Sequence, residues 1–123
     1  MKTRILLSFF ALAFLFSFAM ATNSAPVDPV GTWAYNAPDA PVEYSKGQIV
    51  FSREGGELKG SMVIDTYRLA LENLKLEGNA LSFAVDIDGE YVRISLELTN
   101  DTFSGKASYS EGSLPISGSR VKE

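Results

Sequence analysis

Apolar and polar residues alternate in short runs from Val30 to Arg120, and this period of two limits the fold more than any other feature. Successive side chains of a β-strand point to opposite faces, so an alternating run offers one face to a core and one to solvent. Short turns rich in Gly, Asn and Asp, which tolerate the positive φ of tight hairpins, separate the runs. The clearest turns are Glu54-Gly55-Gly56, Gly78-Asn79, Asp88-Gly89 and Asn100-Asp101. The sequence therefore predicts an all-β, antiparallel domain.

Eight strands are predicted, joined by hairpins in chain order. Their ranges are 30–35, 47–53, 57–64, 67–76, 80–87, 90–98, 103–109 and 114–120. Strands that each have one apolar face close most simply into an up-and-down barrel, because a closed barrel leaves no strand edge exposed. A β-sandwich of two sheets is the alternative arrangement.

The fourth of these strands has an irregular pattern. Leu69 and Leu71 share one parity, whereas Leu74 and Leu76 take the other. A one-residue insertion at Glu72-Asn73 reconciles the two pairs, and such an insertion is a β-bulge. An amphipathic helix across the same segment is the alternative. We favour the bulged strand because hairpin signals flank the segment on both sides.

The first 21 residues have the three parts of a secretory signal peptide. Lys2 and Arg4 supply the positive charge, Ile5–Phe18 form an apolar run, and Ala19-Met20-Ala21 is a typical cleavage site. The apolar run is shorter than the roughly 20 residues that a transmembrane helix requires. We therefore expect an exported protein, periplasmic or secreted, with no membrane insertion after the signal peptide is removed.

This boundary divides the sequence into three parts. Residues 1–21 are the signal peptide, residues 22–29 are a flexible leader of small residues and Pro, and residues 30–123 are a single β-barrel domain. The sequence contains no Cys, so disulfides cannot stabilise the domain and a hydrophobic core must do so. We expect a monomer.

The mature chain is acidic. Removal of Lys2 and Arg4 from the 11 basic residues leaves nine against 15 acidic ones, a formal charge of −6. Such a chain repels phosphate backbones and anionic lipids, so nucleic acid and membrane surfaces are not expected partners. The absence of His and Cys excludes Ser-His-Asp and Cys-His catalysis and the usual zinc ligands. We expect neither an enzyme nor a cofactor.

Three carboxylates, Asp86, Asp88 and Glu90, lie close together in the sequence. Their oxygens suit Ca²⁺, but the spacing is not that of an EF-hand loop, and alternate residues of a strand face opposite sides. A hairpin turn at Asp88-Gly89 explains the same residues without a metal. We assign no metal ligands here, and calcium binding stays an alternative.

Gly31, Trp33 and Arg120 bracket the predicted barrel, in which the first and last strands are neighbours. Together they resemble the signature of the calycin superfamily, which includes lipocalins, fatty-acid-binding proteins and avidins. The resemblance implies a lipocalin-like barrel in which the Arg lies across the Trp at the closed end, a cation–π contact of about 1 kcal/mol. It also implies that these three residues close the barrel and do not bind a ligand.

Two shorter stretches carry further resemblances. The opening Gly31–Asn36 looks like the start of an avidin, but the chain has a single Trp and lacks the other indoles of a biotin pocket, so biotin binding is not expected. Pro38–Pro41 and Phe103–Ser113 resemble small exported bacterial domains of unassigned function. That resemblance implies no catalytic residues.

All five tyrosines fall at one end of the predicted barrel, which we call its mouth. By parity, Tyr35, Tyr67 and Tyr109 point inward just under the rim. Tyr44 lies on the long loop after the first strand, and Tyr91 faces outward. An apolar ring with a polar tip suits the mouth of a pocket, so these five residues are the candidate ligand-binding residues.

The rim at this mouth is acidic, and the interior below it is apolar. The rim carboxylates are Glu43, Asp65, Asp88, Glu90 and Glu111. The interior residues are Phe51, Met62, Ile64, Leu71, Phe83, Ile87, Ile94, Leu96 and Phe103. Strands this short enclose less space than a full lipocalin does, so a packed interior is favoured slightly over a roomy one.

Two functions fit this pattern. The first is a binding module for a small apolar or sugar-like ligand, and it predicts a void beneath Tyr35, Tyr67 and Tyr109. The alternative is a protein–protein adaptor or inhibitor-like domain with a filled core. Such a domain would bind its partner at the rim, through the loop Asn36–Lys46 and the outward Tyr91.

Overall fold

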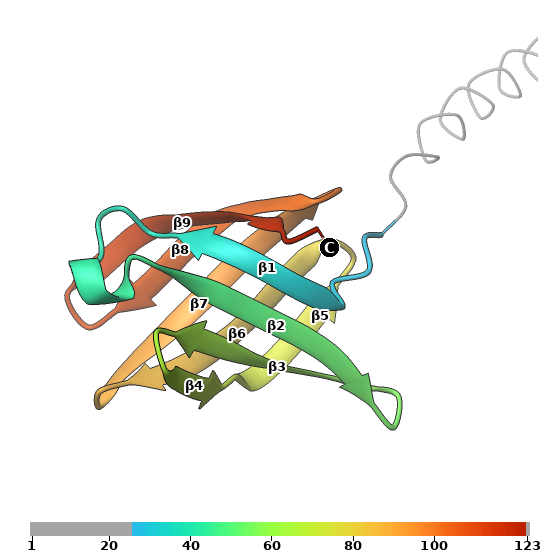
Figure 1. The fold of residues 1–123 in the computed structure, drawn as a ribbon, viewed down its shortest axis with the longest axis horizontal. Coiled ribbons are helices and arrows are strands. Elements are labelled where there is room, and N and C mark those ends of the chain that lie inside the picture. The colour runs from blue at the N-terminus through green and yellow to red at the C-terminus, as the bar shows by residue number, and fades with distance from the viewer. Residues whose placement is uncertain (1–25, 123) are drawn as a thin grey trace, which may run out of the picture.

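A computed structural model describes residues 26–122, which form one antiparallel β-sheet curled into a nearly closed barrel (Figure 1). The strands are β1 (Gly31–Asn36), β2 (Lys46–Glu54), β3 (Glu57–Ile64), β4 (Tyr67–Ala70), β5 (Glu72–Glu77), β6 (Ala80–Ile87), β7 (Glu90–Thr99), β8 (Thr102–Tyr109) and β9 (Gly112–Arg120). A short 3-10 helix, η1 (Val42–Tyr44), lies between β1 and β2. In this part of the chain no helix is long and apolar enough to cross a membrane. The predicted signal peptide, residues 1–21, lies outside the described residues.

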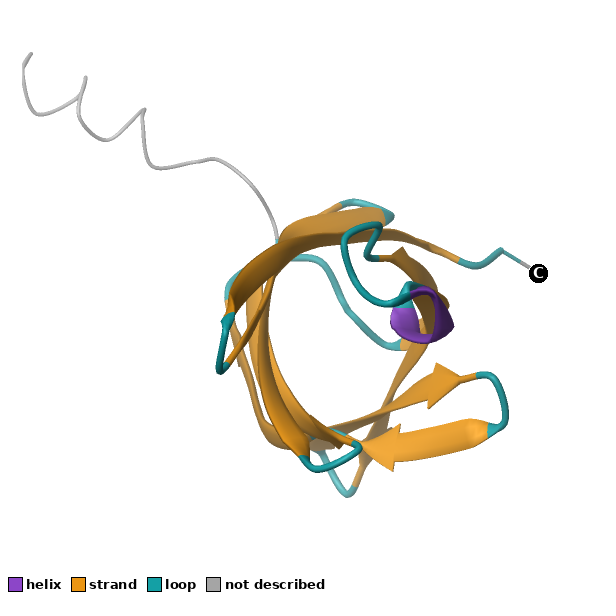
Figure 2. Cartoon of the chain, turned by 90° about the vertical axis from the view of Figure 1, so that its left-hand side faces the viewer, coloured by secondary structure: helices purple, strands orange, loops and turns teal. Residues whose placement is uncertain are grey.

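The barrel closes through its first and last strands. β1 pairs with β2 on one side and with β9 on the other, where Trp33 is the register partner of Arg120. Figure 2 shows the resulting ring, seen from the end at which η1 lies. The prediction of an antiparallel all-β barrel is confirmed. The sandwich alternative is wrong, because the described strands belong to a single sheet.

The barrel has nine strands, so the prediction of eight is wrong. The segment predicted as one strand at 67–76 is divided: β4 pairs with β3, and β5 pairs with β6. The chain changes neighbours at Leu71, whose amide donates to the carbonyl oxygen of Gly60 over 3.1 Å. β4 and β5 are therefore the two edges of the sheet, and the barrel is open between them.

β5 contains the β-bulge that the sequence predicted. Between the pairs Glu72–Ala84 and Lys75–Ser82, β5 has one residue more than β6. Asn73 adopts a φ of 54° there, a left-handed conformation that Asn tolerates. The extra residue switches the parity of the strand, so Leu74 and Leu76 pack against the core. The segment does not form the alternative helix.

Tight turns set the register of the hairpins. Both central residues have positive φ at Gly55-Gly56 (60° and 84°) and at Asp88-Gly89 (55° and 85°). Positive φ at both positions is typical of type I′ turns, whose twist matches that of the paired strands. Because a shift of one residue would turn every side chain to the other face, these turns also decide which residues enter the core.

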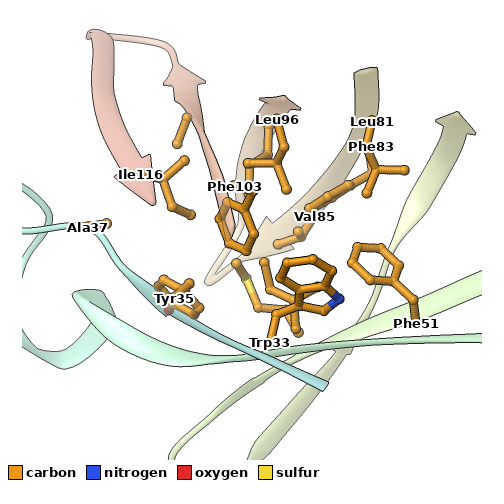
Figure 3. Packing of buried hydrophobic residues seen from close by; sticks show 14 of the residues in the cluster. Trp33, Tyr35, Ala37, Phe51, Leu81, Phe83, Val85, Leu96, Phe103 and Ile116 are labelled. Atoms are coloured by element: carbon orange, nitrogen blue, oxygen red, sulfur yellow. The ribbon is translucent and has the colours of Figure 1, made fainter. Parts of the chain in front are cut away.

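Aromatic rings fill the half of the barrel in which β1 begins (Figure 3). Trp33 is 0% exposed, and its ring centroid lies 5.6 Å from that of Phe103. Phe51 and Phe83 meet edge to face, with centroids 6.1 Å apart. The other buried apolar residues include Tyr35, Ile49, Met62, Ile64, Leu81, Val85, Ile94, Leu96, Leu98, Ala107 and Ile116. The predicted inward parity of these strands is confirmed.

An inward-facing glycine makes room for one of these rings. A Cβ at Gly118 would collide with the ring of Phe103 and with the carbonyl oxygen of Ala34. The ring that occupies the space at Gly118 is therefore that of Phe103. Gly118 lies opposite Phe103 in the register of β8 and β9.

Arg120 and Trp33 meet at the closed end. The guanidinium carbon of Arg120 lies 4.3 Å from the centroid of the Trp33 ring. Its nitrogens donate to the carbonyl oxygens of Val30 (2.8 Å) and Asp28 (2.9 Å) and to Asp101 Oδ1 (3.0 Å). A Cβ at Gly31, where φ is 135°, would lie 3.0 Å from Arg120 Nη1. Glycine at this position therefore lets the guanidinium approach the backbone.

Residues 26–29 belong to the segment predicted as a flexible leader, and they pack across the closed end. The indole N–H of Trp33 donates to the carbonyl oxygen of Pro29 over 2.9 Å, and Pro29 is fully buried. The amide of Val27 donates to Asn79 Oδ1 over 2.7 Å. The salt bridge between Arg120 and Asp101 holds the pKa of that carboxyl below its ordinary value.

Replacement of Trp33 by Ala is expected to reduce the free energy of unfolding by about 3–5 kcal/mol, the usual cost of removing a large buried aromatic ring. The measurement is urea denaturation of the mature protein. Val42→Ala is the control, because Val42 is 86% exposed and its truncation should change stability by less than about 0.5 kcal/mol. Equal losses in the two variants would contradict the role of Trp33 in the core.

Replacement of Arg120 by Lys tests the geometry of the guanidinium. An ammonium keeps the charge but cannot reach both backbone oxygens and Asp101 while lying flat on an indole. We expect a loss of about 1.5–3 kcal/mol in the free energy of unfolding, the range of a hydrogen bond to a charged group. Lys122→Ala should change it little, since Lys122 reaches only Asp101, at 3.5 Å. A fully stable Arg120→Lys variant would show that charge alone suffices.

Candidate ligand-binding site

The loop between β1 and β2 folds over the mouth of the barrel (Figure 2). The amide of Ala37 donates to the carbonyl oxygen of Ser45 over 2.7 Å, and Ala37 is buried. Tyr35, below the loop, donates its hydroxyl to the carbonyl oxygen of Tyr44 over 2.8 Å. These two hydrogen bonds hold η1 against the barrel end and leave space between the loop and the strands.

That space is a cavity of about 380 Å³, which we call the apolar cavity. Its walls are inward residues of the barrel, and its roof is the loop. The principal wall and roof residues are Met62, Ile94, Ala107, Ile116, Ala40 and Pro41. The side chains in its lining that carry polar groups are Tyr35, Tyr44, Glu90, Tyr109 and Glu111.

A second space of about 310 Å³ adjoins the first, and we call it the acidic cavity. Tyr44 and Ile87 line both cavities. The remaining apolar lining of the acidic cavity comes from Ile64 and Leu69. Its polar lining consists of Tyr44, Tyr67, Glu43, Asp65 and Asp88. Every polar side chain in its lining is therefore a carboxylate or a phenol.

The five tyrosines follow the predicted arrangement only in part. Tyr35 is buried, as its parity requires. Tyr67 is 67% exposed, although its register partner is the buried Ile64. β4 has no strand paired to its other edge, so nothing covers this ring. Tyr67 shares the inner face of the sheet with Ile64, but the expectation that it lies under the rim is wrong: it stays exposed at the open edge and lines the acidic cavity.

The two tyrosines of the central hairpins also differ from each other. Tyr109 is 38% exposed and lies at the edge of the apolar cavity. Tyr91 is 42% exposed on the outer face, where its hydroxyl accepts a hydrogen bond from Asn73 Nδ2 over 3.1 Å. The guanidinium carbon of Arg93 lies 5.8 Å from the centroid of the Tyr91 ring. Tyr91 thus lines neither cavity.

Tyr44 forms the boundary between the two cavities. Its hydroxyl donates to Asp88 Oδ2 over 2.7 Å, which ties the loop to the β6–β7 turn. This hydrogen bond raises the pKa of the Tyr44 hydroxyl, because ionisation would place a phenolate beside a carboxylate. One side chain, held by this hydrogen bond, is therefore part of the lining of both cavities.

The three carboxylates considered for calcium have separate partners. Asp86 accepts the amide of Gly89 over 2.9 Å, and Asp88 accepts the hydroxyl of Tyr44. Glu90 accepts the amide and the hydroxyl of Ser110, at 3.2 Å and 3.0 Å. Within residues 26–122 no three acidic side chains are placed to hold a metal ion together.

The roof of the apolar cavity was missed by the sequence analysis. Ala37, Ala40 and Pro41 have no periodic pattern, because they lie in an irregular loop. Their small size is the available signal, since small side chains leave space beneath a loop. Met62 and Ile94, predicted to fill the interior, are buried in the core as expected and also line the cavity, as does the partly buried Ile87. The interior is thus filled at the Trp33 end and hollow at the mouth.

Comparisons with known proteins support the fold alone. No protein-family model matches the sequence, and no curated protein matches it. Among solved structures the chain is similar to a redesigned β-barrel, with a TM-score of 0.52 and 18% sequence identity over 76% of this chain and 91% of that one. The described chain is thus a small antiparallel β-barrel, and the comparisons assign it to no family.

Because the hydroxyl of Tyr35 is buried, the free energy of unfolding is expected to decrease at alkaline pH. Burial raises its pKa from 10.0 to about 12, so between these values the folded chain keeps a proton that the unfolded chain loses. This contribution to stability is complete below pH 10 and declines as pH rises toward 12. We expect the urea midpoint to fall over this interval, and to fall less in Tyr35→Phe. Tyr67→Phe, which removes an exposed hydroxyl, should follow the wild-type profile. Identical profiles for all three proteins would contradict this assignment.

Proposed function

We propose that the mature chain is an exported, non-enzymatic binding module for a small ligand, apolar or sugar-like, at the mouth of its barrel. The observation that supports this most is the apolar cavity under the β1–β2 loop. Its volume of about 380 Å³ falls in the range of small-molecule pockets, about 300–1,000 Å³, and barrel mouths are common sites for them. We propose that the chain acts as a monomer in the periplasm or outside the cell.

The distribution of side chains supports the same function. The large aromatic rings pack together at the Trp33 end. The core is therefore packed there without large side chains at the mouth. The apolar cavity has apolar walls and a few polar groups at its edge, such as Tyr109 and Glu90. A ligand pocket has this composition, because apolar walls supply affinity and a few polar groups fix orientation.

We further propose that the barrel is lipocalin-like and related to the calycins. The support is the position of Arg120 over the ring of Trp33 at the closed end.

The adaptor alternative receives less support. It requires a filled core, whereas the mouth is hollow. The outward Tyr91, which it would use, is exposed but already contacts Asn73 through its hydroxyl and Arg93 through its ring.

The test is native mass spectrometry of the mature protein after expression with its signal peptide. We expect a reproducible bound mass on the wild-type protein and its loss in Ala107→Leu, because Ala107 lines the apolar cavity and a larger side chain would occupy it. Circular dichroism would verify that the variant folds. Tyr91→Ala, on the outer face, is the control and should retain the bound mass. A clean apo mass, together with no binding of added apolar ligands, would favour the adaptor.

A further inference from the structure

The two cavities at the mouth form one site with two kinds of lining. Tyr44 and Ile87 belong to both, so a molecule in one cavity touches the wall of the other. The apolar cavity is walled by residues such as Met62, Ile94 and Ile116. The acidic cavity combines an apolar floor with carboxylates and phenols. A ligand that fills both must therefore be apolar at one end and of different chemistry at the other.

The charge of the acidic cavity indicates the chemistry of the ligand group that it would hold. Its three carboxylates are Glu43, Asp65 and Asp88, and no Lys or Arg lines it. Within residues 26–122 none of the three forms a salt bridge; the described ion pairs lie elsewhere, on Asp28, Glu57 and Asp101. Asp88 has a neutral partner, the hydroxyl of Tyr44. The field in this cavity thus favours a cation and opposes an anion.

An organic cation fits this cavity better than a metal ion does. These carboxylates are not placed to ligate one ion together, and a metal ion needs several oxygens in direct contact. An alkylammonium group is larger than a metal ion, and its positive charge is spread over its own alkyl substituents. It gains from carboxylates at the edge of a cavity and from aromatic faces, and the rings of Tyr44 and Tyr67 line this one.

We propose that the ligand is an amphipathic organic cation, with its apolar body in the apolar cavity and its ammonium group in the acidic cavity. This inference rests on the proposed binding function and specifies the ligand class of the same site. Tyr44, at the boundary, contacts both parts of the bound molecule. The acidic rim supplies selection by charge, while the apolar cavity supplies most of the binding surface.

The test compares three probes that share one apolar chain: octyltrimethylammonium, octanol and octanoate. Binding to the mature protein is measured by isothermal titration calorimetry below the micellar concentration. We expect octyltrimethylammonium to bind at least about tenfold more tightly than octanol, and octanoate to bind most weakly. Added salt should weaken the binding of the cation and leave that of octanol nearly unchanged, because salt screens exposed charges.

The double variant Glu43→Gln, Asp65→Asn removes two carboxylates and leaves the hydrogen bond of Asp88 in place. Asn suits position 65, where φ is 56°, because Asn tolerates the left-handed region. We expect the affinity for octyltrimethylammonium to fall by about fivefold or more, with that for octanol unchanged. Glu54→Gln is the control: it removes one carboxylate at the β2–β3 turn, at the other end of the barrel, and should leave both affinities as they are.

The outcomes separate this inference from the proposed function. Equal binding of octanol and octyltrimethylammonium, or an unchanged cation affinity in the double variant, would overturn the cationic ligand and leave a binding site for apolar molecules. Failure of all three probes to bind the folded protein would overturn the inference and the proposed function together. Tighter binding of octanoate would reverse the assigned charge.

Discussion

The closure of this barrel depends on the contact between Arg120 and Trp33. β1 and β9 share only the register pairs from Trp33–Arg120 to Asn36–Ser117, so the seam between the first and last strands is short. Arg120 strengthens it with one side chain, which covers the indole and donates to Asp101 and to two carbonyl oxygens before β1. The carbonyl oxygens of residues 28 and 30 thus become part of the closed end. The order of the remaining strands follows from this seam and from the hairpins.

The two ends of the barrel differ in packing: the closed end holds the large rings, and the mouth contains the cavities. Large rings at the Trp33 end bury apolar surface efficiently, and burial of that surface is the main source of stability in a domain without Cys. The mouth can then be lined by smaller side chains such as Ala37 and Ala107. A void left by small residues weakens packing locally. The aromatic half of the barrel offsets that loss, and under the proposed function the hollow half is left for a ligand.

The sequence predicted the strands and turns well, but it predicted poorly which side chains neighbouring strands would bury. The period of two and the turn residues placed most strands to within one or two residues, and parity correctly predicted the burial of Trp33 and Tyr35. Parity also gave Tyr67 an inward direction, but burial requires a neighbouring strand, and β4 has none on that side. The bend at Leu71 escaped prediction for a related reason: it depends on which strands lie on either side, and those are distant in sequence.

The shape of the mouth depends on the β1–β2 loop, whose position cannot be predicted from a periodic sequence pattern. Its placement rests on hydrogen bonds at Ala37, Tyr35 and Tyr44, and the bonds at the two tyrosines join the loop to the barrel and to Asp88. Tyr44 lines both cavities, so the position of this loop affects the shape of each. Under the ligand class proposed above, Tyr44 would contact both the apolar body and the ammonium group, so the loop that carries it would link the two parts of the site.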